Sequence, residues 1–179
     1  MGDGVPAVDF AANPHPGAGS REVKAMTTQA EIDAFLAPKR FAFVGVSRDS
    51  GHFSRVAFRE FRKHGFDAIP VRRDAVEIEG VRSYATLREI EPPVECVLVM
   101  LPHDAIAGAA AACIGAGVKR VWFYRGAGQG ALTEGAIQIC EANRIRAIRG
   151  ECPYMFFDHT PWFHRFHGLV RKIRHTYPH

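Results

Sequence analysis

The sequence FAFVGV, at residues 41–46, is an unbroken apolar run that ends in a glycine turn. A strand that is apolar at every position is typical of a strand buried on both faces of a sheet. The run VECVLVML at residues 94–101 is also almost entirely apolar and is the strongest strand candidate in the chain. Both runs therefore predict a sheet whose two faces are covered by helices.

Apolar runs alternate with helical patterns through residues 39–152. Strands are expected at residues 41–46, 67–71, 94–101, 119–124 and 146–148, with a brief extended piece at 80–84. Helices are expected at residues 28–36, 55–64, 86–90, 104–114 and 133–143, with caps at Thr27 or Thr28, Ser54, Asp104 and Thr133. Because the connections are short, this alternation predicts an α/β fold: a doubly wound, mostly parallel sheet of about five strands with flanking helices.

The chain has 179 residues, 47% of them hydrophobic and 23% charged, which suits one globular domain with extensions. Residues 1–25 are rich in glycine and proline and are expected to form a flexible leader. The folded domain is expected at residues 26–155, followed by a basic amphipathic C-terminal helix or tail at residues 156–179. We expect neither a membrane span nor a secretory signal.

The four cysteines include no Cys-x-x-Cys pair, so a structural zinc site is not expected. Cys96, Cys113 and Cys140 stand in apolar segments, where a reduced cysteine behaves as a small hydrophobic residue. This usage predicts a reducing, cytoplasmic location. The net charge of +4 favours anionic partners.

Ligands of doubly wound sheets bind beyond the carboxyl ends of the strands, so the residues after each strand are the candidate site. Gly45 and Val46 are followed by Ser47, and the G-x-G-x-x-G pattern of a standard NAD site is missing. Ser54 and Arg55 open the next helix, where free amides, a hydroxyl and a guanidinium can cradle a phosphate. An ordinary strand-to-helix turn is the alternative.

Val71, Arg72 and Arg73 end the second strand, where NAD enzymes usually carry an acidic residue. Two arginines suit a phosphorylated ribose instead, as in NADP or in coenzyme A (CoA). Exposed arginines are also common at strand ends. The arginine pair and the loop after the first strand both point to a phosphorylated nucleotide, so each supports the other.

The remaining candidates follow the later strands: Leu101, Pro102 and His103; Tyr124, Arg125 and Gly126; Cys152 and Pro153. His103 can reach a ligand, although a solvent-facing side chain is the simpler expectation. The glycine-rich loop at Gly126 can bind an anion or cover a ligand, and it also fits a plain loop. Cys152 stands where the ligand crevice is expected, as a reactive thiol if nearby cations lower its pKa, or as a packing residue without chemistry.

These strand ends resemble the CoA-binding domain family, the small stand-alone relatives of the N-terminal nucleotide-binding domain of the succinyl-CoA synthetase alpha subunit. The resemblance covers about residues 39–155 and is carried by Val44-Gly45-Val46-Ser47, Ser54-Arg55-Val56, Ile69-Pro70-Val71, Val121-Trp122-Phe123 and Cys152-Pro153. It implies a Rossmann-like domain that binds CoA at the carboxyl edge of the sheet.

The resemblance also implies roles by position. Residues that would meet the pyrophosphate or the ribose phosphate are Gly45, Ser47, Ser54 and Arg55. Residues that would flank the adenosine end are Val71, Arg72 and Arg73, and those that would line the adenine or pantetheine path are Leu101, Pro102 and His103. Cys152 and Pro153 would close the pocket near the thiol end. The family commonly has Val-Asn-Pro where this chain has Val71-Arg72-Arg73, and Trp-x-Gln where it has Trp122-Phe123-Tyr124.

The leading hypothesis is a non-catalytic or regulatory module that binds CoA or an acyl-CoA, because no complete catalytic constellation is visible. The synthetase needs a second domain with a phosphohistidine, so ligase activity of this chain alone is not expected. The alternatives are an NADP-dependent oxidoreductase, suggested by Arg72 and Arg73, and a redox protein in which Cys152 forms a mixed disulfide with CoA.

The tail at residues 159–179 carries five of the nine histidines, four basic residues and no acidic residue. His164 and His167 have a spacing that could hold a metal, but no carboxylate or cysteine accompanies them, so no metal site is expected. The apolar stripe of the tail can close over the sheet, pair with a second copy as a homodimer, or contact another partner. Nucleic-acid and membrane partners are not expected.

Overall fold

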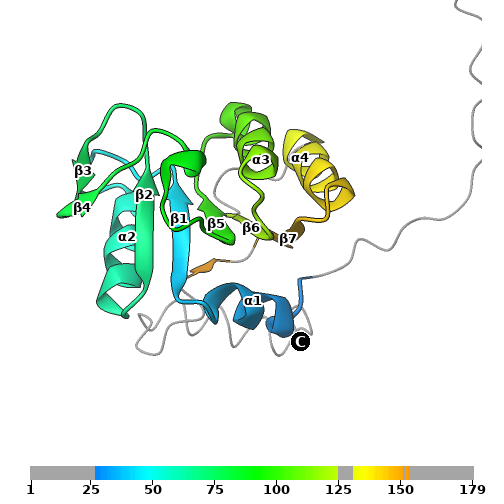
Figure 1. Ribbon diagram of the computed structural model, residues 1–179, viewed down its shortest axis with the longest axis horizontal. Helices are drawn as coiled ribbons and strands as arrows, with labels where there is room; N and C mark the ends of the chain where they lie inside the picture. The colour runs from blue at the N-terminus through cyan, green and yellow to red at the C-terminus, as the bar shows by residue number, and fades with distance from the viewer. Residues whose placement is uncertain (1–26, 125–130, 151, 154–179) are drawn as a thin grey trace, which may run out of the picture.

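The computed structural model describes residues 27–124, 131–150 and 152–153 (Figure 1). The elements in chain order are α1 (Gln29–Leu36), β1 (Arg40–Val44), α2 (Phe53–Lys63), β2 (Asp67–Val71), β3 (Glu77–Ile78), β4 (Val81–Arg82), η1 (Leu87–Glu89), β5 (Cys96–Val99), η2 (His103–Ala105), α3 (Ile106–Gly115), β6 (Arg120–Phe123), α4 (Ala131–Ala142) and β7 (Arg146–Arg149). The predicted leader, the predicted tail helix, Arg125 and Gly126 lie outside the described residues.

Five strands form one sheet in the order β2-β1-β5-β6-β7, and every neighbouring pair runs parallel. The predicted α/β fold, a Rossmann-like parallel sheet with flanking helices, is confirmed. The chain passes from β1 to β2 on one side and then returns to β5 on the other side. The strand order therefore reverses between β1 and β5, which is where ligands of such sheets bind.

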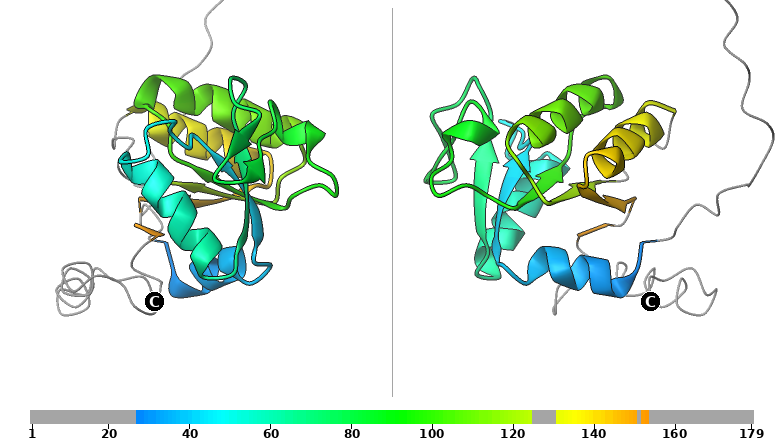
Figure 2. Two further views of the ribbon diagram at one scale, coloured as in Figure 1. Left: turned by 90° about the vertical axis from the view of Figure 1, so that its left-hand side faces the viewer. Right: turned by 45° about the vertical axis from the view of Figure 1, so that its right-hand side comes forward.

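Helices cover both faces of the sheet, α1 and α2 on one face and α3 and α4 on the other (Figure 2). The core under α1 and α2 is aromatic and includes Phe35, Phe41, Phe43, Phe58, Phe61 and Trp122. The core under α3 and α4 is built from smaller side chains, among them Ala42, Val97, Val99, Ala110 and Cys113. Successive strand residues point to opposite faces, so a strand that feeds both cores is apolar throughout.

The start of α1 confirms the predicted cap. Thr28 Oγ1 accepts a hydrogen bond from Glu31 N at 3.3 Å, and Glu31 Oε2 accepts one from Thr28 N at 3.0 Å, which is a capping box. Thr27 Oγ1 instead accepts from Arg149 N at 2.9 Å. The beginning of the described chain is thereby tied to the last strand.

Three other predicted helix starts were wrong. His52, and not Ser54, caps α2 through its side chain, and Ser54 lies in the first turn. Asp104 belongs to η2, and α3 begins at Ile106 without a side-chain cap. Thr133 lies inside α4, which begins at Ala131. Polar residues are also acceptable within a first turn, so residue type places a helix start only to within a few residues.

A two-stranded antiparallel hairpin, β3 with β4, lies between β2 and η1 along the chain. Its turn residues, Glu79 and Gly80, both have positive φ, as tight two-residue hairpin turns require. Only an extended piece at residues 80–84 was predicted here, and the predicted helix at 86–90 is the single turn η1. Strands of two residues are too short for hydrophobic periodicity to reveal.

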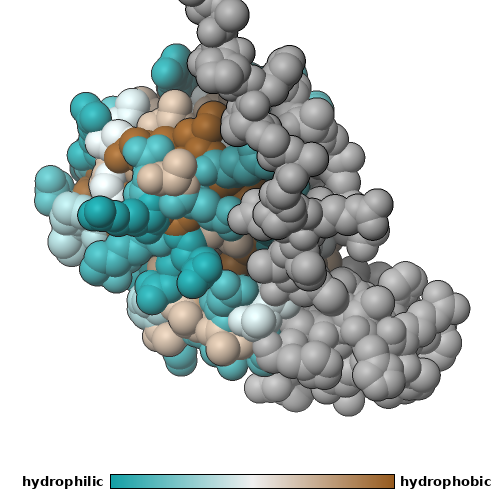
Figure 3. Space-filling view, turned by 90° about the vertical axis from the view of Figure 1, so that its right-hand side faces the viewer, coloured by the Kyte–Doolittle hydropathy of each residue, from teal (hydrophilic) through white to brown (hydrophobic). Residues whose placement is uncertain are grey.

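The surface of the described residues carries few large apolar side chains. Val76 and Ile139 are the exposed ones. Seen from the side of α4, the described surface mixes hydrophilic residues with smaller hydrophobic areas (Figure 3). None of the described helices has the length and the apolar character needed to cross a membrane. The homodimer suggested by the tail stays a prediction.

Candidate functional site

The β1–α2 loop (residues 45–52) lies at the reversal of strand order, against the end of β5. Gly45 begins the loop with φ +98. A Cβ atom on Gly45 would lie 2.2 Å from Met100 O and 2.7 Å from Met100 C. The loop therefore packs against the backbone after β5 at a distance that only glycine allows.

Ser54 supports this loop from within α2. Its side chain is 1% exposed, and its Oγ accepts a hydrogen bond from Ser47 N at 3.0 Å. The Oγ also lies 2.9 Å from His52 Nδ1, which accepts from Ser54 N at 3.2 Å. The hydroxyl and the amide that were predicted to bind phosphate are thus occupied by the loop and by its cap.

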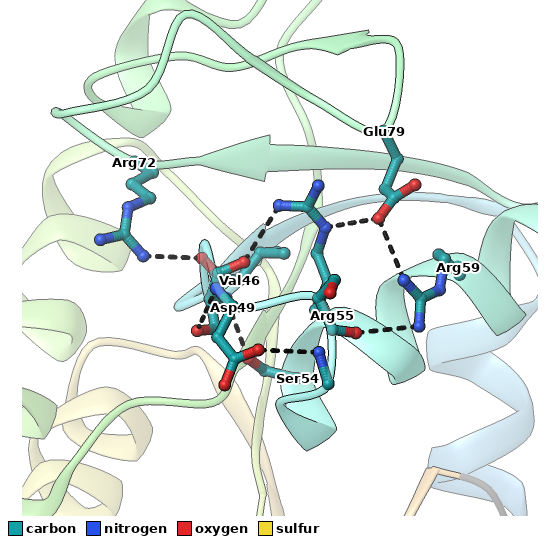
Figure 4. Close-up of polar contacts among 10 residues, drawn as sticks. Val46, Asp49, Ser54, Arg55, Arg59, Arg72 and Glu79 are labelled. Carbon is teal, nitrogen blue, oxygen red and sulfur yellow. Dashed lines mark hydrogen bonds and ion pairs between the residues drawn. The ribbon is translucent and has the colours of Figure 1, made fainter.

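Arg55 lies between the loop and the β3–β4 hairpin (Figure 4). Its Nη1 donates to Ser47 O at 3.1 Å, and its Nε donates to Glu79 Oε1 at 2.5 Å. Arg59 Nη1 also contacts Glu79 Oε1 at 3.3 Å. The hydrogen bond from Arg55 is the main cause that holds the pKa of Glu79 below its ordinary value.

Arg72 and Arg73 are adjacent in sequence but have different surroundings. Arg72 forms a two-pronged ion pair with Asp74, and its Nη1 donates to Val46 O at 2.9 Å. The hydrogen bond from Arg72 lowers the pKa of Asp74. Arg73 is exposed and makes no hydrogen bond or ion pair within the described part of the chain. Arg73 is therefore available for an anionic ligand.

Two pockets flank the reversal point and share Leu101. The arginine-side pocket, about 410 Å³, is lined by Val44, Val71, Arg73, Ala85, Thr86, Leu87, Leu101, Ala105, Gly108, Ala109 and Ala112. The tyrosine-side pocket, about 440 Å³, is lined by His52, Phe53, Ser54, Met100, Leu101, Pro102 and Tyr124. Both volumes lie in the range of small-molecule sites. The two pockets, which lie at the carboxyl ends of β1 and β5, are together the candidate site.

Tyr124 and Phe53 form the aromatic wall of the tyrosine-side pocket. Their rings are stacked, with centroids 5.2 Å apart and planes inclined by 26°. Burial raises the pKa of the Tyr124 phenol, and the neighbouring Cys152 raises it further. Cys152 is half-buried against the aromatic core, and Pro153 is buried. The structure thus places Cys152 next to the wall of this pocket.

His103 contradicts the expectation of a solvent-facing side chain. The residue is only partly exposed, and among the described residues its Nε2 is buried without a hydrogen-bond partner. His103 lies in η2, which packs against α3 and α4, and it lines neither pocket. The sequence pattern did not predict this short 3-10 turn, and so did not predict the burial of the ring nitrogen.

A family model described as "CoA binding domain" matches residues 39–158 of this chain. This chain belongs to the CoA binding domain family. The matched range contains every strand of the sheet and both pockets. The family predicted from the strand ends is therefore confirmed.

The chain is also similar to individual proteins. An uncharacterised protein of Bacillus subtilis (strain 168) is 28% identical over 126 residues, which are 70% of this chain and 90% of that protein. The alpha subunit of an ADP-forming acetate–CoA ligase II of Pyrococcus furiosus is 26% identical over 91 residues, 50% of this chain, but the match spans only 20% of that subunit. A solved structure of a hypothetical protein from Pyrococcus horikoshii OT3 superposes with a TM-score of 0.64 at 19% identity, covering 76% of this chain and 93% of that one, and so supports the fold.

In this CoA binding domain, the structure brings most of the predicted site residues to one edge of the sheet. Residues that line a pocket are Ser54, Val71, Arg73, Leu101, Pro102 and Tyr124. Residues that shape the β1–α2 loop are Gly45, Val46, Ser47, Arg55 and Arg72. His103, Cys152 and Pro153 line neither pocket, although Cys152 lies near Tyr124 of the tyrosine-side pocket.

The sequence interpretation missed the acidic partners of the arginines and most of the residues that line the pockets. Glu79 and Asp74 hold Arg55 and Arg72, and Phe53, Met100 and Gly108 line the pockets. Asp74, two residues from Arg72, could have been recognised as a local ion-pair partner. Glu79 could not, because it is 24 residues away from Arg55 in the sequence.

No group of three or more His, Cys, Asp or Glu side chains that could hold a metal ion occurs within residues 27–124, 131–150 and 152–153. The four cysteines form no disulfide. The predicted mixed disulfide between Cys152 and CoA stays a prediction.

The buried thiols of this CoA binding domain predict a loss of stability in base. Burial raises the pKa of Cys113 to about 12 and that of Cys140 to about 11, from an ordinary value of 9.0. The unfolded chain releases these protons above pH 9.0, whereas the folded chain keeps them. The thiol contribution is thus complete below pH 9.0 and is lost as the pH rises toward the folded pKa values, by at most about 1.4 kcal/mol per thiol for each pH unit.

Urea unfolding at a series of pH values from 8 to about 11 measures this slope. The double variant Cys113→Ala, Cys140→Ala is the control, and its free energy of unfolding should fall less steeply above pH 9.0. Equal slopes for the two proteins would contradict the prediction.

Proposed function

We propose that this domain binds CoA across the carboxyl edge of its sheet, without a catalytic step of its own. The adenosine 3′-phosphate end lies in the arginine-side pocket near Arg73, and the pantetheine arm enters the tyrosine-side pocket. The observation that carries the proposal is the pair of pockets that share Leu101. One is lined by Arg73, which has no acidic partner among the described residues, and the other has a largely apolar wall. Family membership supplies the choice of CoA.

The charges and shapes of the two pockets suit the two ends of CoA. Arg73 lines the arginine-side pocket and has no acidic partner among the described residues, so its guanidinium is free to pair with a phosphate dianion. The helix wall of that pocket is formed by alanine and glycine, which leaves room for a flat adenine ring. The tyrosine-side pocket has an aromatic and aliphatic wall suited to the pantetheine arm and to an apolar acyl group on its sulfur.

The test is isothermal titration of the protein with CoA, with 3′-dephospho-CoA and with NADP. CoA is expected to bind, 3′-dephospho-CoA to bind more weakly, and NADP to bind weakly or not at all. Binding of NADP alone would refute the proposal and favour an oxidoreductase. Binding of none of the three would also refute it.

Arg73→Gln is expected to reduce the affinity for CoA about tenfold and to leave the affinity for 3′-dephospho-CoA nearly unchanged. The variant removes the charge that pairs with the 3′-phosphate, and the second ligand lacks that phosphate. Titration of both ligands into both proteins measures the two ratios. Arg62→Gln is the control, because Arg62 is an exposed arginine at the far end of α2. Equal losses for CoA and for 3′-dephospho-CoA would show that Arg73 does not recognise the 3′-phosphate.

A further inference from the structure

We infer that Arg55 and Arg72 are positioning residues, which hold the β1–α2 loop in the shape that receives the CoA pyrophosphate and do not contact the phosphates themselves. This inference rests on the proposed function, because it assigns the roles of two arginines in the binding of CoA. We call Arg55 with Glu79, and Arg72 with Asp74, the two clamps.

Each clamp joins a loop carbonyl to a fixed carboxylate. Arg72 Nη1 donates to Val46 O at 2.9 Å, and Arg55 Nη1 donates to Ser47 O at 3.1 Å, so consecutive peptide groups are held. Arg55 Nε also donates to Glu79 Oε1 (Figure 4), and Arg72 donates to both carboxylate oxygens of Asp74 through Nε and Nη2. The guanidinium is a planar, rigid fork, and anchoring one prong fixes the direction of the other. The loop is thus held from the side of the hairpin and of β2.

The clamps decide which way the loop presents its polar groups. In a planar trans peptide the carbonyl oxygen and the amide hydrogen point in opposite directions. With Val46 O held by Arg72, the amide of Ser47 points the other way, toward Ser54 Oγ at 3.0 Å. Ser54 lines the tyrosine-side pocket. The clamps therefore keep the negative ends of these peptide dipoles away from the side on which an anion would bind.

The surroundings of Arg55 and Arg72 argue against direct contact with a phosphate group of the ligand. Neither Arg55 nor Arg72 lines either pocket, whereas Arg73 does. Arg55 is 17% exposed, and its charge is balanced by Glu79, which is 29% exposed. A guanidinium already neutralised at short range offers little attraction to a second anion. The two clamp arginines therefore act through the loop.

The substitution Glu79→Gln distinguishes the two roles of Arg55, because they predict opposite changes in the affinity for CoA. If Arg55 bound phosphate directly, removal of its competing carboxylate would strengthen the binding of CoA. Simple electrostatics predicts the same, because a negative charge near a polyanionic ligand is lost. The positioning role predicts weaker binding, roughly fivefold to tenfold, which corresponds to about one hydrogen bond. The variant keeps the shape of the side chain and the exposed hairpin turn.

Glu77→Gln is the matched control. Glu77 lies on the same hairpin, is exposed, and makes no ion pair or hydrogen bond within the described residues. The Glu77→Gln variant loses the same negative charge but leaves both clamps intact. Its affinity for CoA should therefore equal or exceed that of the unsubstituted protein. Arg55→Lys should behave like Glu79→Gln, since a lysine keeps the charge but cannot bridge carbonyl and carboxylate as a planar fork does.

The experiment is titration of CoA into the unsubstituted protein and the three variants, with hydrogen exchange of the loop amides measured on each. The inference expects faster exchange in residues 46–51 for Glu79→Gln and Arg55→Lys, and unchanged exchange for Glu77→Gln. Equal or tighter CoA binding by Glu79→Gln than by Glu77→Gln would overturn the inference while leaving CoA binding itself intact. Failure of the unsubstituted protein to bind CoA would overturn the proposed function and the inference together.

Discussion

Gly45→Ala is expected to lower the free energy of unfolding by about 3 kcal/mol or more. The left-handed backbone at Gly45 costs an alanine about 1–2 kcal/mol. The new Cβ would also lie 2.2 Å from Met100 O, and a clash in a well-packed region costs about 1–3 kcal/mol. Because both opposing atoms belong to the backbone of the segment after β5, neither can move aside as a flexible side chain could.

Gly65→Ala separates the two costs. Gly65 has φ +80, and a Cβ there would meet no atom within 4 Å. Urea unfolding of both variants should show a loss of about 1–2 kcal/mol for Gly65→Ala and a distinctly larger loss for Gly45→Ala. Equal losses would mean that the close approach to Met100 carries no energetic weight.

Gly108→Trp is expected to weaken CoA binding by roughly a hundredfold or more without unfolding the domain. Gly108 lies in α3, lines the arginine-side pocket, and has open space where a Cβ would stand. An indole ring there would occupy the volume that we assign to adenosine. The smaller change Gly108→Ala should stabilise the domain by about 0.5–1 kcal/mol, because glycine is a poor helix former.

Ala111→Trp is the matched control for the blocking variant. Ala111 is an exposed residue of the same helix and lines neither pocket. Calorimetric titration with CoA should show full binding by Ala111→Trp and almost none by Gly108→Trp. If the two tryptophan variants bind CoA equally, the adenosine end does not occupy this pocket.

The five strands of the parallel sheet were predictable because they depend on local patterns. β1 and β5 are apolar at nearly every position, and short connections leave few alternatives to a parallel sheet. Gly45 was recognised from the turn that follows β1. The physical reason for this glycine is its close approach to Met100, which lies just after β5. Because Met100 is distant in the sequence, this contact could not be seen there.

The location of the candidate site at the carboxyl ends of the strands was predicted, but the different contacts of its arginines were not. Arg55, Arg72 and Arg73 look equivalent in sequence, and all three were expected near phosphate or ribose. The structure separates them by partners, since Glu79 and Asp74 engage the first two and Arg73 keeps an open guanidinium within the described residues. Such a division depends on contacts between distant segments, which composition and spacing do not encode.

The alanine and glycine residues that line the arginine-side pocket lower the stability of the ligand-free protein. Gly108, Ala109 and Ala112 of α3, with Ala105 at the end of η2, line a hollow of about 410 Å³ beside the core. Larger apolar side chains there would add dispersion contacts and stiffen the helix, so this sequence is less stable than the same fold could be. A ligand that fills the hollow returns part of that lost stability. At these four positions, greater stability therefore favours larger apolar side chains, whereas an open ligand pocket favours alanine and glycine.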